Sequence, residues 1–595
     1  MARIVAALAF LGVVGATVPA QAPPVHITPT PVAADDWAHV TTHFAVHVAW
    51  ADGGSVRLRR SLDRGCTWEP EQVLYQGAPC SDLCIAGDEA SGGIAVAWRA
   101  ASSTGDSIVA TWSPSGASGT WSAPAPTNLR TGGVRRLPRV ALTPISGATG
   151  MWLQLVWCED AGDVYWQRRH TGSPPTAEVR VHAGSHVREL ALTADWLVSL
   201  LPFGRRAHGL LAWRDGTGAA ASIGSVACLD VESTSPTFVA THHAAGRVDG
   251  VQVRAGRKAL SLGQPAELEL FVVWRSRQGS SGTVLVDATT AGLGQTLPAW
   301  EHGTMPLPST SAPGRPDAAL VPATLSLGGG PVPGELLLVV EQDGAIVLGR
   351  ARRAPTLVFS PPTLLSTTGA GATGPVLGAD ASAAFAAWRQ GGSGSDRLVF
   401  TRSLDRGATW NAPSHTATAA ATFAAGTMAA AYAVDGKRGA GAATAGWLIG
   451  RGASSQPGLW LQTMLGVQTN GSPAGPSQPT LTHTFGEPVP GGSMHFELVA
   501  QVASVTASYW LFSFTSPGPI DLGLALPACD GRLLHVGGPV VPTAATYGGG
   551  AVGNWLLLPA TTAMYGSQIH VTAVIWQPTQ PCLFDVANGL SIYVN

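Results

Sequence analysis

The octapeptide SLDRGCTW at residues 61–68 returns as SLDRGATW at residues 403–410, and this repeat decides the fold. Both copies follow an apolar run and read Ser-x-Asp-x-Gly-x-Thr-Trp. In such a pattern Ser and Asp bond local backbone amides, Gly supplies a positive φ, and Trp begins the next strand as a large apolar group. The shared positions are Ser61, Asp63, Gly65, Thr67 and Trp68, and then Ser403, Asp405, Gly407, Thr409 and Trp410. Each copy predicts a tight turn between two strands, in which these side chains are structural.

The chain contains a second repeat, in which a short apolar strand that ends in Trp recurs along the sequence. Its members end at Trp50, Trp98, Trp157, Trp213, Trp274 and Trp388, with degenerate members at Glu341 and Trp447. Successive members lie 47 to 67 residues apart, which is the length of a four-stranded unit with variable loops. Eight repeats predict eight such units, or seven if the first or last is only a closing fragment.

The octapeptide is similar to the Asp-box of sialidases and other proteins with bacterial neuraminidase repeats (BNR repeats). This resemblance covers residues 23–465 and implies a β-propeller of four-stranded blades. It also implies that each box forms the turn between the third and fourth strands, on the face away from the active site. The motif is therefore specific for the fold and says little about function.

Composition supports an all-β protein. The chain has 595 residues, with 73 Gly and 44 Pro against only 12% charged residues, which favours many short strands joined by turns. A net charge of -2 and a pI near 6.8 argue against a nucleic-acid-binding protein, which needs a basic excess.

Both ends of the chain differ from the repeats. Residues 1–22 carry one Arg, an apolar stretch and a small-x-small ending, which predicts a cleavable signal peptide and a secreted or cell-surface protein. No later stretch has the roughly 18 continuous apolar residues that a membrane helix requires. Residues 466–478 are rich in Gly, Ser and Pro and predict a linker. Residues 479–595 alternate polar and apolar side chains and predict an antiparallel β-sandwich, which loosely resembles C-terminal β modules of exported bacterial proteins.

Cysteine is present in an odd number, so the thiols cannot all pair within one chain. The positions are Cys66, Cys80, Cys84, Cys158, Cys228, Cys529 and Cys582. Cys529 and Cys582 lie together in the last segment and are the expected disulfide, while Cys80 could bridge to Cys84 or either could reach Cys66. A metal site is not expected, because no Cys or His quartet has ligand spacing. His39, His43 and His47 recur every four residues, but the outer two would lie roughly 26 Å apart along one strand.

Arginine marks the face opposite the octapeptide turns. Four arginines follow the repeated strand-ending residue directly: Arg99, Arg214, Arg275 and Arg389. Arg135 and Arg136 begin the first strand of a unit and fall on the same face. Such guanidinium groups suit the carboxylates or sulfates of acidic glycans. The alternative is that each Arg pairs with a neighbouring carboxylate or stacks on the adjacent Trp.

The resemblance to sialidases also implies a catalytic set, namely an Arg triad, a Tyr nucleophile activated by Glu, and an Asp acid/base. The Arg-Ile-Pro motif of that family has an approximate counterpart beginning at Arg136, and Tyr432 is the late propeller Tyr that could act as the nucleophile. No Glu partner can be assigned from spacing. Asp88 and Glu89 fall between a first and a second strand, on the wrong face.

Two functions remain open. The first is a non-catalytic, exported, monomeric propeller that binds a carbohydrate or a cell-surface glycoprotein through its Arg-bearing face. The second is an exo-acting glycoside hydrolase of sialidase type with divergent motifs. Binding is favoured, because 37 Asp and Glu residues supply few acid and base groups on the relevant loops. No Gly-rich loop opens a helix, so no nucleotide cofactor is expected.

Overall fold

The computed structural model describes residues 25–28, 36–42, 45–62, 68–88, 91–103, 105–128, 133–145, 150–160, 162–200, 203–258, 267–292, 296–321, 323–326, 330–353, 356–379, 384–391, 397–403, 406–410, 413–415, 423–434, 444–452, 458–470, 479–486, 493–500, 506–515, 520–521, 533–534, 537–547, 550–557, 568–576, 584–587 and 589–593. Within them the secondary structure is β-strand, apart from one short 3₁₀ turn, η2, at Gly218–Ala220. The prediction of an all-β protein is confirmed.

Seven antiparallel sheets follow one another along the chain, and in each the strands pair in chain order. Their strands are β2 (Trp37–Thr41), β3 (Val46–Asp52), β4 (Ser55–Ser61) and β5 (Gln72–Gln76); β6 (Cys80–Gly87), β7 (Ile94–Ala100), β8 (Ser107–Ser113) and β9 (Ala125–Pro126); β10 (Arg135–Pro144), β11 (Met151–Glu159), β12 (Val164–His170) and β13 (Val179–His182); β14 (Val187–Leu200), β15 (Phe203–Asp215), β16 (Ser222–Leu229) and β17 (Thr237–Ala245); β18 (Val248–Arg257), β19 (Leu268–Gln278), β20 (Ser281–Ala291) and β21 (Glu301–Thr304); β22 (Asp317–Val321), β25 (Glu335–Gln342), β26 (Ala345–Arg353), β27 (Leu357–Phe359) and β28 (Thr363–Leu364); and β29 (Ala372–Ala379), β30 (Ala384–Gln390), β31 (Arg397–Ser403) and β32 (Ser414–His415). A small hairpin of β23 (Thr324–Ser326) and β24 (Gly330–Val332) lies between β22 and β25.

An eighth sheet closes the series with strands from both ends of the propeller sequence. It contains β33 (Phe423–Val434), β34 (Thr444–Gly452) and β35 (Leu459–Asn470), and β1 (Val25–Thr28) pairs antiparallel with β35 as the fourth strand. The imidazole of His26 stacks on Trp460 with ring centroids 4.1 Å apart. The first described strand is therefore held in the last sheet.

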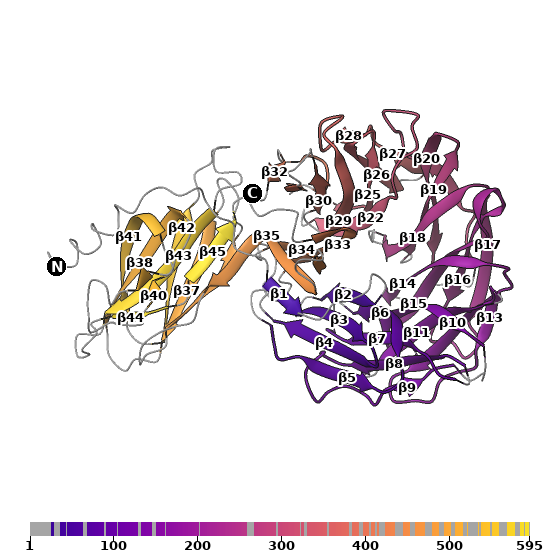
Figure 1. The fold of residues 1–595 in the computed structure, drawn as a ribbon, viewed down its shortest axis with the longest axis horizontal. Coiled ribbons are helices and arrows are strands. Elements are labelled where there is room, and N and C mark those ends of the chain that lie inside the picture. The colour runs from indigo at the N-terminus through magenta and orange to yellow at the C-terminus, as the bar shows by residue number, and fades with distance from the viewer. Residues whose placement is uncertain are drawn as a thin grey trace.

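The first strands of the eight sheets form a ring (Figure 1). Each lies against the first strand of the next sheet, in the order β2, β6, β10, β14, β18, β22, β29 and β33, and β33 returns to β2. This is the arrangement of a β-propeller, in which radial closure leaves only the short outer strands as edges. The eight described sheets match the number of repeats counted in the sequence.

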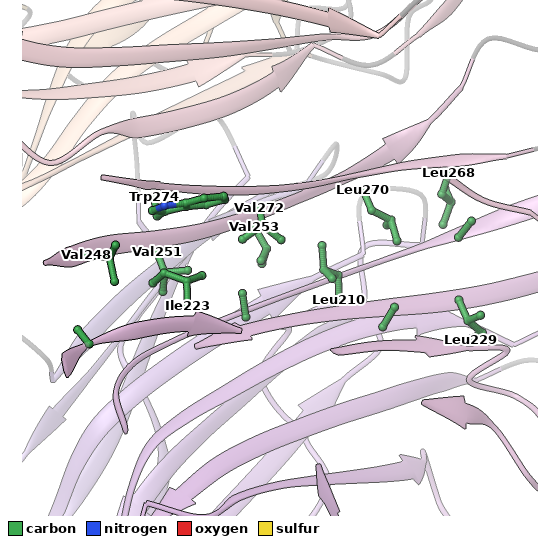
Figure 2. Close-up of a cluster of buried hydrophobic side chains, with 14 of the residues drawn as sticks. Leu210, Ile223, Leu229, Val248, Val251, Val253, Leu268, Leu270, Val272 and Trp274 are labelled. Carbon is green, nitrogen blue, oxygen red and sulfur yellow. The ribbon is translucent and has the colours of Figure 1, made fainter. Parts of the chain in front are cut away.

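The repeated tryptophans end the second strands and fill the spaces between sheets. Trp50, Trp98, Trp157, Trp274 and Trp388 are fully buried. Figure 2 shows one such space, where Leu210 and Ile223 of the fourth sheet meet Val253, Leu270 and Trp274 of the fifth. Burial of each of these side chains stabilises the fold by about 1.5–3 kcal/mol. The repeat of strand and Trp is thus a repeat of contacts between sheets.

Two further sheets form the C-terminal part. One contains β38 (Thr506–Thr515), β41 (Gly537–Tyr547), β43 (Gln568–Trp576), β44 (Phe584–Val586) and β45 (Gly589–Tyr593), and the other contains β36 (Thr480–Gly486), β37 (Ser493–Ala500) and β42 (Gly550–Leu557). A short pair, β39 (Ile520–Asp521) and β40 (Leu533–Leu534), is separate. The two sheets share one apolar core, in which Phe496 and Leu498 pack with Trp510 and Val571.

The connection between the two parts differs from the predicted linker. Residues 466–470 belong to β35, which pairs with β34 in the propeller and then with β45 in the C-terminal sheet. Only residues 471–478 of the expected linker lie outside the described residues. One strand therefore joins the two parts through backbone hydrogen bonds on both sides of the boundary.

Candidate functional site

The second octapeptide copy forms the turn between β31 and β32. The backbone N–H of Gly407 donates to Ser403 Oγ at 2.7 Å, and the indole N–H of Trp410 donates to the Gly407 carbonyl oxygen at 3.1 Å. Arg406 and Gly407 have φ values of +63° and +86°, which favour Gly at the second position. Trp410 packs against the core shared by the sixth and seventh sheets. The turn joins a third and a fourth strand, where the octapeptide predicts it; Asp405 lies outside the described residues.

The first copy follows β4 and occupies the same place in its sheet. Ser61 is buried at the end of β4, and Trp68 packs beside Trp50 in the core between the eighth and first sheets. Arg60 and Glu69 flank the turn and form a bidentate pair, with Nε–Oε2 at 2.9 Å and Nη2–Oε1 at 2.6 Å. This pair clamps the two ends of the turn; positions 63–67 lie outside the described residues.

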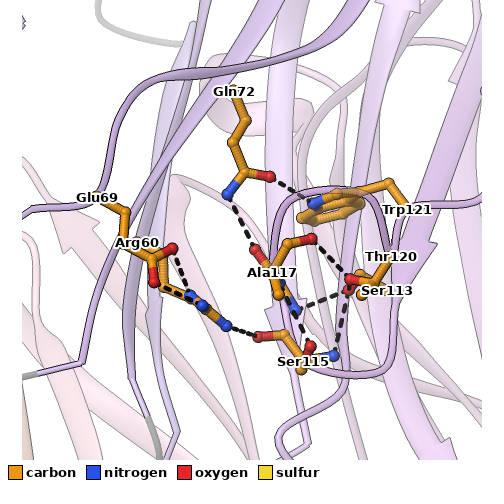
Figure 3. A network of polar contacts seen from close by, with 9 residues as sticks. Arg60, Glu69, Gln72, Ser113, Ser115, Ala117, Thr120 and Trp121 are labelled. Carbon is orange, nitrogen blue, oxygen red and sulfur yellow. Dashed lines mark hydrogen bonds and ion pairs between the residues drawn. The ribbon is translucent and has the colours of Figure 1, made fainter.

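A third, degenerate copy between β8 and β9 escaped the sequence analysis. Residues 113–121 read Ser-Pro-Ser-Gly-Ala-Ser-Gly-Thr-Trp, one residue longer than the octapeptide and with Ser in place of Asp. The backbone N–H of Gly116 donates to Ser113 Oγ at 2.7 Å, as Gly407 donates to Ser403 (Figure 3). The Thr-Trp ending and its place after a third strand were the signals that could have identified it.

This third turn is tied to the first sheet by side chains around the first copy (Figure 3). Arg60 Nη1 donates to the Ser115 carbonyl oxygen at 3.0 Å, and Gln72 Nε2 donates to the Gly116 carbonyl oxygen at 3.2 Å. The indole N–H of Trp121 donates to Gln72 Oε1 at 3.0 Å. These turns therefore hold neighbouring sheets together, which is a structural role.

Ligand-binding candidates lie at the opposite edge of the sheets, where second strands end and first strands begin. We call this edge the Arg-bearing face, after the five arginines Arg99, Arg135, Arg214, Arg275 and Arg389. Because neighbouring strands are antiparallel, the octapeptide turns and the connections from first to second strands share the other face.

Arg99 and Arg135 share carboxylates between the second and third sheets. Arg99 Nε donates to Asp106 Oδ2 at 2.8 Å, and its Nη1 lies 3.6 Å from Asp82 Oδ2. Arg135 is 1% exposed; its backbone N–H donates to Asp106 Oδ2 at 3.3 Å and its Nη1 donates to the Asp106 carbonyl oxygen. Glu159 Oε1 lies 3.6 Å from Arg135 Nη2. Both arginines therefore have carboxylate partners.

Arg214 and Arg275 repeat this arrangement in the fourth and fifth sheets. Arg214 Nη1 lies 3.2 Å from Glu189 Oε1. Arg275 grips Asp249 with Nε–Oδ1 at 2.6 Å and Nη2–Oδ2 at 2.8 Å, and its Nη1 donates to the Pro313 carbonyl oxygen at 2.8 Å. Both side chains therefore pair with a carboxylate, and ligand binding by these arginines stays a prediction.

The Arg-Leu-Pro tripeptide at residues 136–138 lies in a β-bulge of β10. Its pairing with β11 shifts between Arg136 and Arg139, and Leu137 has φ +53°. Three other first strands have the same shift beside a positive φ, at Asp82, Gly250 and Gly374. The tripeptide is thus one copy of a recurrent backbone feature, in which the extra residue bends the strand. Sequence patterns did not reveal this feature, because it depends on the register between strands.

The remaining candidates, catalytic and ligand-binding, lie in different sheets. Arg136 is half-buried beside that bulge, and Arg389 pairs in the β29–β30 ladder opposite Thr373. Tyr432 lies in β33, and its side chain is outside the described part. Asp88 is buried between β6 and β7 on the far face, where its Oδ2 accepts the Ser91 backbone N–H at 2.7 Å. Glu89 lies outside the described residues.

A buried Ser-His-Asp chain lies between the fourth and fifth sheets. Ser225 Oγ is 2.6 Å from His243 Nε2, and His243 Nδ1 is 2.6 Å from Asp287 Oδ2. His302 Nδ1 contacts the other carboxylate oxygen at 2.6 Å. This sequence of groups is that of a hydrolase triad, but Ser225 and the His243 side chain are 0% exposed. Because substrate cannot reach Ser225, these hydrogen-bonded side chains serve to hold the fourth and fifth sheets together. We call Ser225, His243 and Asp287 the clasp.

Four cysteines are described, and all four are free and buried. Burial raises the pKa of Cys84 and Cys228 to about 12, and that of Cys80 and Cys158 to about 11. Cys80 and Cys84 therefore form no bridge with each other or with Cys66. The predicted Cys529–Cys582 pair lies outside the described residues and stays a prediction.

Histidines and carboxylates form no metal site in the described part of the chain, where no group of three such side chains could hold an ion. His47 is buried, and desolvation lowers its pKa to about 4; His39 lies near Trp37, with ring centroids 6.1 Å apart. His43 lies outside the described residues. No helix in the part of the chain that the structure describes is long and apolar enough to cross a membrane.

No protein family model matches this chain, and no curated protein matches it. Solved structures with a similar backbone include the polysaccharide lyase Uly1, with a TM-score of 0.33 and 9% identity over 66% of this chain and 93% of that chain. The Aleuria aurantia lectin bound to α-methyl-L-fucoside has a TM-score of 0.26 and 11% identity over 57% and 96%. Oligopeptidase B from Trypanosoma brucei has a TM-score of 0.33 and 11% identity over 71% and 54%. At these scores the likenesses carry no argument for function.

Proposed function

We propose that this protein is an exported β-propeller that binds a glycan through its Arg-bearing face without cleaving it. The observation that carries the proposal is the repeated arrangement of arginines on that face, where Arg99, Arg135, Arg214 and Arg275 each have a carboxylate partner in their own sheet. The proposed partner is a carbohydrate or a cell-surface glycoprotein, and the proposed state is a monomer outside the cell.

The chemistry of these pairs suits a sugar. A guanidinium keeps N–H donors beyond those used by its partner, and a carboxylate keeps lone pairs, so each pair offers donors and acceptors side by side. Sugar hydroxyls need both. The Arg99 side chain is 29% exposed and is already held by Asp106, so binding there requires little further ordering.

The same contacts disfavour catalysis at these pairs. Asp106 accepts from Arg99 and from the Arg135 backbone, and Glu189 accepts from Arg214 and from the Val251 backbone N–H at 2.9 Å. A general base needs a lone pair directed at the substrate, whereas these carboxylates are directed at protein donors. The carboxylates of this face are thus arranged to hold the arginines and the neighbouring backbone in position.

One observation favours the alternative, an exo-acting glycoside hydrolase of sialidase type. Glu341 replaces the repeated Trp at the end of a second strand, on the Arg-bearing face, and desolvation raises its pKa. A glycosidic leaving group requires a proton donor, and a raised pKa is the direction that this role needs. Glu341 is therefore the carboxyl group to test for acid catalysis.

The test is incubation of the purified protein with sialylated and uronic-acid glycans, followed by mass spectrometry of the retained and released sugars. Retention of intact glycan, weakened by Arg99→Gln but not by the control Arg206→Gln on the opposite face, supports the proposal. Arg206 is a matched control for Arg99, because its Nη1 lies 3.8 Å from Asp230 Oδ2 and its side chain is also partly exposed. Release of free sugar that Glu341→Gln, Arg136→Ala or Tyr432→Phe abolishes would instead establish the glycosidase.

A further inference from the structure

Four exposed arginines gather on one part of the Arg-bearing face, where β14, β18 and β22 begin. They are Arg188, Arg247, Arg277 and Arg315, and we call them the arginine sector. Arg188 is the second residue of β14, and Arg247 lies in the connection from β17 to β18. The backbone N–H of Arg277, near the end of β19, donates to the Arg247 carbonyl oxygen at 2.8 Å. Arg315 packs beside Gly250, where an added Cβ would lie 3.6 Å from Arg315 Cγ.

Few carboxylates balance this sector. Glu189 Oε1 lies 3.0 Å from Arg315 Nη2, and the same oxygen pairs with Arg214. Asp249 Oδ2 lies 3.5 Å from Arg277 Nη2, and the same oxygen pairs with Arg275. Four guanidinium groups, those of Arg214, Arg275, Arg277 and Arg315, therefore share two carboxylates. The nearby Asp215 is occupied by His182 and by the backbone N–H groups of Ser185 and His186.

The four side chains of the sector are exposed to solvent. The Arg315 side chain is 64% exposed and the Arg277 side chain is 45% exposed. Within the described residues, the side chains of Arg188 and Arg247 make no hydrogen bond or ion pair. A guanidinium has five N–H donors in a planar fork, so each of these side chains can still take a bidentate anionic partner.

The excess of like charge has a physical consequence. Positive groups close together repel one another, and water and salt reduce this repulsion only partly. A ligand with anionic oxygens would remove the repulsion and use the unfilled donors at the same time. The ion pairs to Glu189 and Asp249 hold Arg315 and Arg277 in place for such a ligand.

We propose that the arginine sector binds carboxylate or sulfate groups of the glycan held on the Arg-bearing face. This inference rests on the proposed glycan-binding function and names the class of ligand: a saccharide that carries several negative charges. The sector is distinct from Arg99, Arg135 and Arg136, which lie at the second and third sheets.

The experiment is titration calorimetry of the full chain with three probes: oligogalacturonate, dextran sulfate and neutral dextran. The test variant is Arg277→Ala with Arg315→Ala. The matched control is Arg206→Ala with Arg257→Ala, which removes two partly exposed arginines, 40% and 47% exposed, from the opposite face. Circular dichroism and the unfolding midpoint check that each variant is folded.

We expect the wild-type protein to bind at least one charged probe, with affinity that falls as salt rises. The test variant should lose at least about tenfold in that affinity, a change of about 1.4 kcal/mol, and the control should change by less than about twofold. The oligogalacturonate and dextran sulfate arms distinguish carboxylate from sulfate. Equal losses in the two variants, no loss in the test variant, or equally tight binding of neutral dextran would overturn the inference while leaving the proposed function. Failure to bind any of the three probes would overturn both.

Discussion

Replacing Asp287 with Asn is expected to weaken the contact between the fourth and fifth sheets by about 1.5–4 kcal/mol. Asp287 is 6% exposed and accepts from two imidazoles, those of His243 and His302, each at 2.6 Å. His243 is held further by Ser225, and its ring lies 4.8 Å from that of Trp300. Asn keeps the shape of Asp, so the change removes charge without creating a cavity.

The magnitude follows from the burial of each partner. The His243 side chain is 0% exposed, and a buried hydrogen bond to a charged group contributes about 1.5–3 kcal/mol. The His302 side chain is 57% exposed, so its contact with Asp287 contributes about 0–1 kcal/mol. The matched control is therefore His302→Ala, which should cost no more than about 1 kcal/mol.

The assay is native-state hydrogen exchange of peptides from β17 and β20, because a propeller of this length need not unfold in one step. An opening free energy lowered by about 1.5–4 kcal/mol increases the exchange rate between roughly 13-fold and 900-fold. Exchange in Asp287→Asn within about threefold of wild type, or equal to that in His302→Ala, would refute the clasp.

Three further predictions concern pH and packing. Burial raises the pKa of the Glu269 carboxyl group from 4.5 to about 7. Between pH 4.5 and pH 7 this group therefore binds a proton in the folded state but not in the unfolded state. The protonated Glu269 stabilises the fold fully below pH 4.5, and this contribution is lost as the pH rises through 7. Urea unfolding should show that the free energy of unfolding falls by about 3 kcal/mol less between pH 5 and pH 8 in Glu269→Gln than in the wild type. An equal fall in both proteins would contradict this prediction. Gly407→Ala should lower the free energy of unfolding by about 2–4 kcal/mol, because φ is +86° and the new Cβ would lie 2.7 Å from a Leu337 side-chain atom. The control Gly279→Ala, where φ is +65° and nothing lies near the new Cβ, should lower it by about 1 kcal/mol. Similar losses for the two variants in thermal unfolding would refute the packing argument. His26→Ala removes the stack on Trp460 and should speed proteolysis near β1 several-fold, whereas an unchanged cleavage rate would argue against a closing role for that strand.

Local patterns predicted the fold well. The turn from Ser403 to Trp410 depends on residues a few positions apart, so its sequence determines its place between third and fourth strands. The repeated Trp likewise follows from the buried end of each second strand. The turn beginning at Ser113 was missed because one extra residue breaks the octapeptide spacing while leaving the Ser-to-Gly hydrogen bond intact.

Contacts between sheets were not predictable in the same way. The partner of Arg275, Asp249, lies in the neighbouring strand β18, and the Arg99 partner Asp106 directly precedes β8, so both pairs depend on strand register. The positive φ of Leu137 depends on a bulge that no residue type predicts. Gly466 belongs to a stretch rich in Gly, Ser and Pro that predicts a linker, whereas in the structure the backbone of β35 continues to Asn470 and pairs with β45.

The central claim, glycan binding by the Arg-bearing face without cleavage, is tested most directly by hydrogen exchange with and without a retained glycan, together with mass spectrometry of the sugar. The account predicts protection of peptides that contain Arg188, Arg247, Arg277 and Arg315, no change around Arg60 and Ser113, and recovery of the glycan intact. Protection confined to the octapeptide turns, or recovery of a shortened glycan, would contradict it.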